Sequence, residues 1–156
     1  MPGLKESGGE IGVPNAMILE SWNFPAATDW VDMHLLRLPF PARLVHASAM
    51  AAAVGTTGTF NLMKLASGTA PDSGTSVLVG GTAINLSALA TNLIQILALT
   101  ASTAANPHGV NGELLFAAGD ILSLSCGGSP LTVAGAFITV HFIPFPGVRR
   151  EFDAGL

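Results

Sequence analysis

The feature that most constrains this chain is a long span with almost no charge. Between Arg43 and Glu113 only Lys64 and Asp72 are charged, and small, hydroxyl-bearing and aliphatic residues fill the rest. A soluble domain normally covers its surface with charged side chains, because charges are stable in water and costly to bury. A span without them must pack against other protein surfaces or be solvated by hydroxyl and backbone groups. It therefore suits a component of a packed assembly better than a free monomeric enzyme.

The overall composition is that of one folded domain with no electrostatic signature for nucleic acid. The 156 residues are enough for a real core, and the hydrophobic fraction is 49% although only 10% of residues are charged. A net charge of −4 gives no basic patch for nucleic acid. The most apolar stretch, 83–105, is interrupted by amide and hydroxyl side chains, so we expect no membrane span. The first ten residues lack the apolar core of a signal peptide, so Sec-dependent export is not expected.

Short alternating segments predict the fold class. They are separated by turns rich in glycine and proline, and we expect strands over 31–38, 59–65, 76–79, 96–100, 114–116, 121–126 and 131–142. Residues 42–53 fit a strand or, by their alanine content, a helix. Asn85 or Ser87 is a candidate cap for one short helix reaching Leu93. The pattern predicts an all-β protein, a β-sandwich or jelly roll, with at most one short helix.

The same sequence pattern divides the chain into three predicted segments. Residues 1–28 are broken by glycines and prolines and are predicted to form an extended N-terminal arm, residues 29–148 the β-sandwich domain, and residues 149–156 a charged C-terminal tail. Trp22, Phe24 and Trp30 lie in the arm or at its junction with the body, and we take them as interface candidates. The alternative is that they close the end of the domain's own core. If they are interface residues, removing 1–28 should abolish binding to a partner and leave the β domain folded.

The sequence lacks the usual constellations of catalytic residues. The four histidines (His34, His46, His108 and His141) include no His-x-His pair, as cupin metal sites require, and no serine sits in a Gly-x-Ser-x-Gly elbow. The single cysteine, Cys126, excludes an intramolecular disulfide.

The central carboxylates offer little more. They form only two pairs near each other in sequence, Asp29 with Asp32 and Glu113 with Asp120, and Asp120 is placed to bond turn backbone. We expect no catalytic residue, no cofactor, no metal and no enzymatic activity. A metal-dependent jelly-roll enzyme stays open only if His46 and His141 meet across a sheet together with a carboxylate.

Two stretches carry a resemblance to a known group. The segment 117–142, AAGDILSLSCGGSPLTVAGAFITVHF, and the upstream GTFNLMK at 58–64 with the Ser/Gly/Thr loop 67–76 resemble small β-sandwich structural proteins of tailed bacteriophages. Within that group the chain is most similar to capsid decoration (cement) proteins. The resemblance implies a homotrimer, made in the host cytoplasm and bound on the outer capsid surface of the virion. There it would bridge neighbouring subunits of the major capsid protein and stabilise the shell.

A tail-fibre or receptor-binding recognition module is the alternative function. Such modules usually bind glycans through exposed aromatic and carboxylate side chains on their loops. Here the loops 67–76 and 101–112 contain no aromatic residue, and Asp72 is their only carboxylate. This composition counts against sugar recognition.

Overall fold

The computed structural model describes residues 17–53, 57–66, 68–81, 83–100, 114–128 and 133–144. Within these ranges the regular structure is β-strand, joined by single turns of 3-10 helix. The strands are β1 (Ile18–Phe24), β2 (Met33–Arg37), β3 (Ala42–Met50), β4 (Thr59–Leu65), β5 (Thr75–Ser76), β6 (Ile84–Asn85), β7 (Gln95–Ile96), β8 (Leu115–Phe116), β9 (Ile121–Gly127) and β10 (Ala136–Pro144). The 3-10 turns are η1 (Ala27–Asp29), η2 (Val79–Gly81) and η3 (Leu86–Ala88). The predicted all-β class is confirmed.

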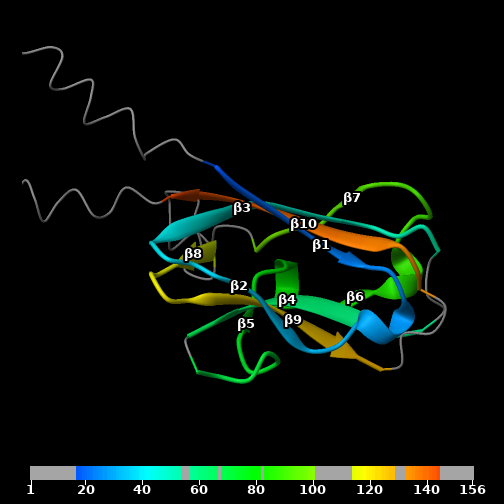
Figure 1. Cartoon of the computed structure of the whole chain (residues 1–156), viewed down its shortest axis with the longest axis horizontal. Coiled ribbons are helices and arrows are strands. Elements are labelled where there is room, and N and C mark those ends of the chain that lie inside the picture. The colour runs from blue at the N-terminus through cyan, green and yellow to red at the C-terminus, as the bar shows by residue number, and fades with distance from the viewer. Residues whose placement is uncertain are drawn as a thin grey trace, which may run out of the picture.

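The strands form two antiparallel sheets that pack face to face. Sheet A has the order β1-β10-β3-β7, and β8 also pairs with β3. Sheet B has the order β2-β9-β4-β5, and β6 also pairs with β4. Figure 1 shows the two layers, with β1, β3 and β10 on one side and β2, β4 and β9 on the other. Strands far apart in the sequence are therefore neighbours in each layer.

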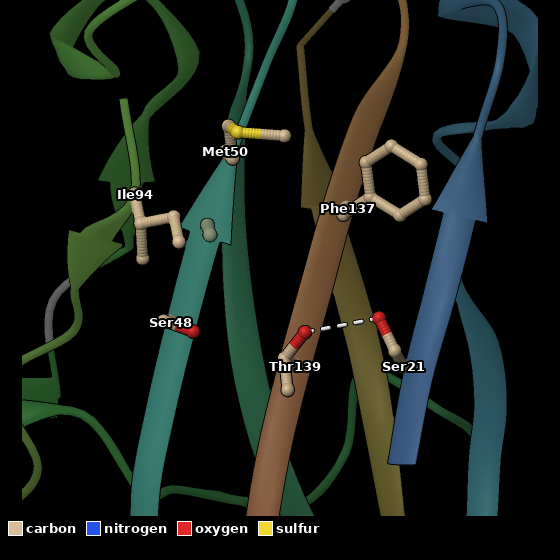
Figure 2. A pocket seen from close by; sticks show the side chains of 7 residues that line it. Ser21, Ser48, Met50, Ile94, Phe137 and Thr139 are labelled. Atoms are coloured by element: carbon tan, nitrogen blue, oxygen red, sulfur yellow. Dashed lines mark hydrogen bonds between the residues drawn. The ribbon is translucent and has the colours of Figure 1, made fainter. Parts of the chain in front are cut away.

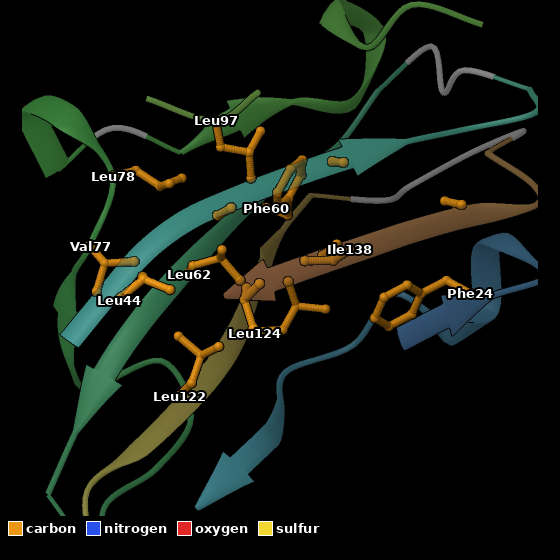
Figure 3. Packing of buried hydrophobic residues seen from close by; sticks show 14 of the residues in the cluster. Phe24, Leu44, Phe60, Leu62, Val77, Leu78, Leu97, Leu122, Leu124 and Ile138 are labelled. Atoms are coloured by element: carbon orange, nitrogen blue, oxygen red, sulfur yellow. The ribbon is translucent and has the colours of Figure 1, made fainter. Parts of the chain in front are cut away.

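The core lies between the two sheets and follows from the period-two alternation of the strands. Strand β10 lies between β1 and β3. Its residues Ile138 and Val140 are fully buried, whereas Phe137 is exposed. Leucines of β9 and β4 meet these residues from sheet B, as Figure 3 shows for Leu62 and Leu124. Each fully buried aliphatic side chain contributes about 1.5–3 kcal/mol relative to exposure, so this layer dominates the stability of the fold.

The predicted N-terminal arm is wrong over its second half. Residues Ile18–Phe24 form β1, and they pair with β10 from Ile18 opposite Phe142 to Phe24 opposite Ala136. The sequence does contain the signal for this strand, because Trp22 and Phe24 lie two residues apart with polar Ser21 and Asn23 beside them. Removing 1–28 would delete an edge strand of sheet A, so a truncation that preserves the fold must stop at residue 16. Residues 1–16 and the predicted tail 149–156 lie outside the described residues.

Two local predictions are resolved by the structure. Residues 42–50 form strand β3 and not a helix, because β3 pairs with β10 on one side and with β7 and β8 on the other. The short helix expected from Asn85 to Leu93 shrinks to the single turn η3, in which Leu86 is buried. The strand predicted over 131–142 is β10, which covers Ala136–Pro144 and so ends two residues later than predicted.

Candidate interaction surface

The three predicted interface aromatics lie in or against the protein's own core. Phe24 and Trp30 are 2% and 3% exposed, and their rings stack with centroids 4.7 Å apart. Trp30 also contacts Phe60, at 5.3 Å between ring centroids. Trp22 is half-buried and packs against the same cluster. The structure thus brings the three together, but it places Phe24 and Trp30 where no partner can reach them in the folded chain.

The surface that is free for a partner is the outward side of sheet A. We call it the outer face of sheet A, and strand pairing assigns to it alternate residues of β1, β10 and β3 together with two residues at β7. They are Leu19, Ser21, Asn23, Phe137, Thr139, His141, Ile143, Arg43, His46, Ser48, Met50, Ile94 and Ile96.

Large apolar side chains stand exposed on this face. Ile94 and Ile96 are 74% and 71% exposed, and Leu19 is 59% exposed. Phe137, at 39%, lies with Met50 and Ile94 around a shallow hollow of about 240 Å³, shown in Figure 2. Contiguous apolar surface of this kind marks interaction sites in soluble proteins.

Hydroxyl groups supply the polarity of this face. The Ser21 and Thr139 hydroxyls are hydrogen-bonded to each other at 2.9 Å, across β1 and β10 (Figure 2). Arg43 is the one charged residue among those that define the face, while Glu20, opposite Val140, lies on the other side of β1. A partner surface can therefore cover most of the face without burying a charge, which is the costly part of forming an interface.

The outward side of sheet B is covered by the chain itself around Leu65 and Ser123, whereas His34 and Arg37 of β2 in the same sheet are exposed. The segment 68–81, which contains β5 and η2, runs along β4, and its Pro71 reaches Ser123 of β9. Leu65 is 2% exposed although it lies outside the main core cluster. Gly74 passes so close that a Cβ atom there would lie 2.4 Å from the Lys64 carbonyl oxygen and 2.8 Å from Leu65 Cγ. Glycine is required at this crossing because any side chain would collide with β4.

Side-chain hydrogen bonds fasten this covering segment to sheet B. The fully buried Ser123 hydroxyl donates to the Pro71 carbonyl at 2.7 Å. Ser76 donates to Asn61 Oδ1 at 2.7 Å, and the Asn61 amide donates to the Gly81 carbonyl at 3.4 Å. These polar side chains are satisfied within the chain, so this part of sheet B is not free for another protein.

Two histidines meet on the outer face of sheet A. His46 of β3 is directly opposite His141 of β10, with ring centroids 4.8 Å apart. The meeting that a jelly-roll metalloenzyme would require is therefore present, but no described carboxylate joins it. Among the described residues no three of the histidines, cysteines and acidic residues come together as a metal-binding group. His34 lies on β2 in the other sheet.

The carboxylates considered for catalysis bond backbone N–H groups. Asp29 accepts from Ala26 at 2.7 Å and Asp32 from Cys126 at 2.6 Å. Asp120 accepts from the Ala117 N–H at 2.8 Å, as expected for an aspartate in a turn, and lies 3.8 Å from the Lys64 ammonium. Glu113 lies outside the described residues. These aspartates hold turns and strand ends in place, and no two of them bond a shared group.

The Cys126 thiol is half-buried beside Asp32. Burial, with a smaller contribution from the Asp32 charge, raises the pKa of Cys126 to about 12. The thiolate is the reactive form of cysteine, so this side chain is protonated and a poor nucleophile at neutral pH. It serves as a small strand residue packed against the core.

The comparisons leave the chain without a known relative. No family model, no curated protein and no solved structure matches it. None of the helical turns in the described ranges is long and apolar enough to cross a membrane.

The exposed isoleucines at β7 are the functional candidates that sequence reasoning missed. Their signal is the run Leu93-Ile94-Gln95-Ile96, in which apolar residues occupy both strand registers of a charge-free stretch.

Proposed function

We propose that this protein is a structural, non-enzymatic component of a phage virion that decorates and stabilises the capsid. It would bind through the outer face of sheet A to neighbouring subunits of the major capsid protein. The observation that carries the proposal is the exposed, nearly uncharged outer face of sheet A, whereas the outward side of sheet B is partly covered by the chain itself. The resemblance of the 58–76 and 117–142 segments to decoration proteins supports the choice of partner.

The energetics of such binding are additive burial of apolar surface. Leu19, Ile94 and Ile96 each stand more than half exposed, and full burial of one such side chain contributes about 1.5–3 kcal/mol before ordering costs. An apolar contact of this kind needs no reaction and no cofactor. Self-association into a trimer, which the resemblance implies, would bring several such faces to one site on the shell.

The first test is the abundance of the protein in purified particles, measured by quantitative mass spectrometry. Near parity with the major shell protein is the expected result for a decoration protein spread over the head. A few per cent would contradict the proposal and favour a tail or fibre recognition module. Complete absence from particles would overturn both virion functions.

The second test locates the binding face. Ile96→Asp places a carboxylate at an exposed position on the outer face of sheet A, and we expect it to bind shells about 100-fold more weakly, equivalent to about 2.8 kcal/mol. Val31→Asp is the matched control, because Val31 is 50% exposed and lies outside this face. Circular dichroism checks that both variants fold. Equal binding by Ile96→Asp and the wild type would exclude the outer face of sheet A as the contact surface.

A further inference from the structure

The pair formed by His46 and His141 has the arrangement of a chelating site. The two residues are cross-strand partners on β3 and β10, both are half-buried, and their rings lie 4.8 Å apart at 45°. The register shifts directly after this pair, between His141 and Phe142. A β-bulge at such a point bends the strand and re-aims its side chains. Both imidazoles thus project from one side of sheet A at adjacent positions.

We propose that this pair binds a divalent transition-metal ion of the Zn²⁺, Cu²⁺ and Ni²⁺ class through one ring nitrogen of each histidine. Imidazole is a preferred ligand for these ions. Two nitrogens on a tetrahedral zinc ion lie about 3.3 Å apart, given Zn–N bonds of about 2.0–2.1 Å. Rings whose centres are 4.8 Å apart reach that separation by small rotations that turn a nitrogen of each toward the other. The site goes beyond the proposed capsid function and does not depend on it.

The surroundings set the character of the site. Leu19 of β1 is the neighbour of His141 on the other side of β10, and it offers no ligand. Arg43, which precedes His46 on β3, adds a positive charge nearby. With two protein ligands and no carboxylate in the described surroundings, the remaining coordination positions go to water. The site is therefore a weak, exchangeable one and not a catalytic zinc centre.

The test is metal binding by tag-free full-length protein, measured by isothermal titration calorimetry. We expect one ion per chain, with Cu²⁺ bound more tightly than Zn²⁺ or Ni²⁺, and no binding of Mg²⁺. His46→Gln and His141→Gln should each weaken binding at least tenfold. His34→Gln, at an exposed position on β2, is the matched control and should bind as the wild type does.

Two outcomes would overturn the site. One is the absence of Zn²⁺, Cu²⁺ and Ni²⁺ binding at millimolar concentration by wild-type protein. The other is binding that persists in the His46→Gln/His141→Gln double variant, which would place the ion elsewhere. Nuclear magnetic resonance of the wild-type protein tests the site even if a variant misfolds. Ni²⁺ should broaden the imidazole signals of His46 and His141 and leave the signal of His34 sharp. Capsid binding is measured separately, so failure of one proposal leaves the other standing.

Discussion

The outward faces of sheets A and B are built from similar residues, but their apolar side chains differ in exposure to solvent. On sheet B, Leu65 is 2% exposed because the segment 68–81 passes it at Gly74. On sheet A, Ile96 is 71% exposed, and Ser21 and Thr139 bond each other at an open surface. The face of sheet B is covered around Leu65 by the chain itself, and the face of sheet A is exposed among the described residues.

This contrast shows how a chain with few charges can still make a defined surface. The hydroxyl and amide groups of Ser123, Ser76 and Asn61 are used to hold the covering segment. Those groups replace the charged residues that would otherwise keep the face of sheet B in water. No described segment covers the outer face of sheet A, where Leu19, Ile94 and Ile96 are exposed. We infer that the assembled state, and not the free chain, is where this face is buried.

The largest expected effect is on the free energy of unfolding, and it compares one aliphatic residue from each of the two faces. Leu65→Ala removes a buried side chain under the covering segment and should lower the free energy of unfolding by about 2–5 kcal/mol. Ile96→Ala, on the open face, should change it by less than about 0.5 kcal/mol. Urea unfolding of both variants measures the difference. Equal costs would mean that the two faces are covered to the same degree, and the comparison would fail.

A smaller effect on the free energy of unfolding is expected when one serine hydroxyl is removed from each face. Ser123→Ala leaves the Pro71 carbonyl without its donor in a buried place, and we expect a loss of about 1–2 kcal/mol in unfolding free energy. Ser21→Ala breaks the exposed bond to Thr139, where water replaces the lost partner, so the loss should stay below about 0.5 kcal/mol. Thermal and urea unfolding of the pair provide the measurement. A larger loss at Ser21 would show that the outer face of sheet A is held by its own polar network.

The smallest effect is a pH dependence confined to alkaline solution. The pKa of Cys126 is raised from 9.0 to about 12 in the fold, so the folded chain keeps the thiol proton after the unfolded chain has lost it. The thiol's contribution is therefore unchanged below pH 9 and should diminish as pH rises from 9 toward 12. The unfolding free energy of wild type minus that of Cys126→Ser isolates this contribution. A difference that changes between pH 6 and 8 would contradict it.

Local sequence patterns were enough for most of the strands. The sequence pattern predicts strands over segments such as 59–65 and 121–126, and the structure has β4 and β9 there. Strand β1 was missed because the glycines and prolines before it outweighed the Trp22–Phe24 alternation. The prediction that the aromatics form an interface has a related weakness. A sequence shows that a residue is apolar but not which surface will cover it. Phe24 and Trp30 became core because β1 and η1 fold back over the end of the sandwich.

The sequence by itself determined an all-β chain that is poor in charge and rich in turns, because side-chain period and turn chemistry act over a few residues. Only the tertiary structure decided which part of sheet B is covered, since that depends on where the segment 68–81 lies. It also decided the meeting of His46 with His141, which belong to strands distant in the chain. Contacts between distant strands are set by sheet order and register, and both result from burial of the whole core rather than from any local pattern.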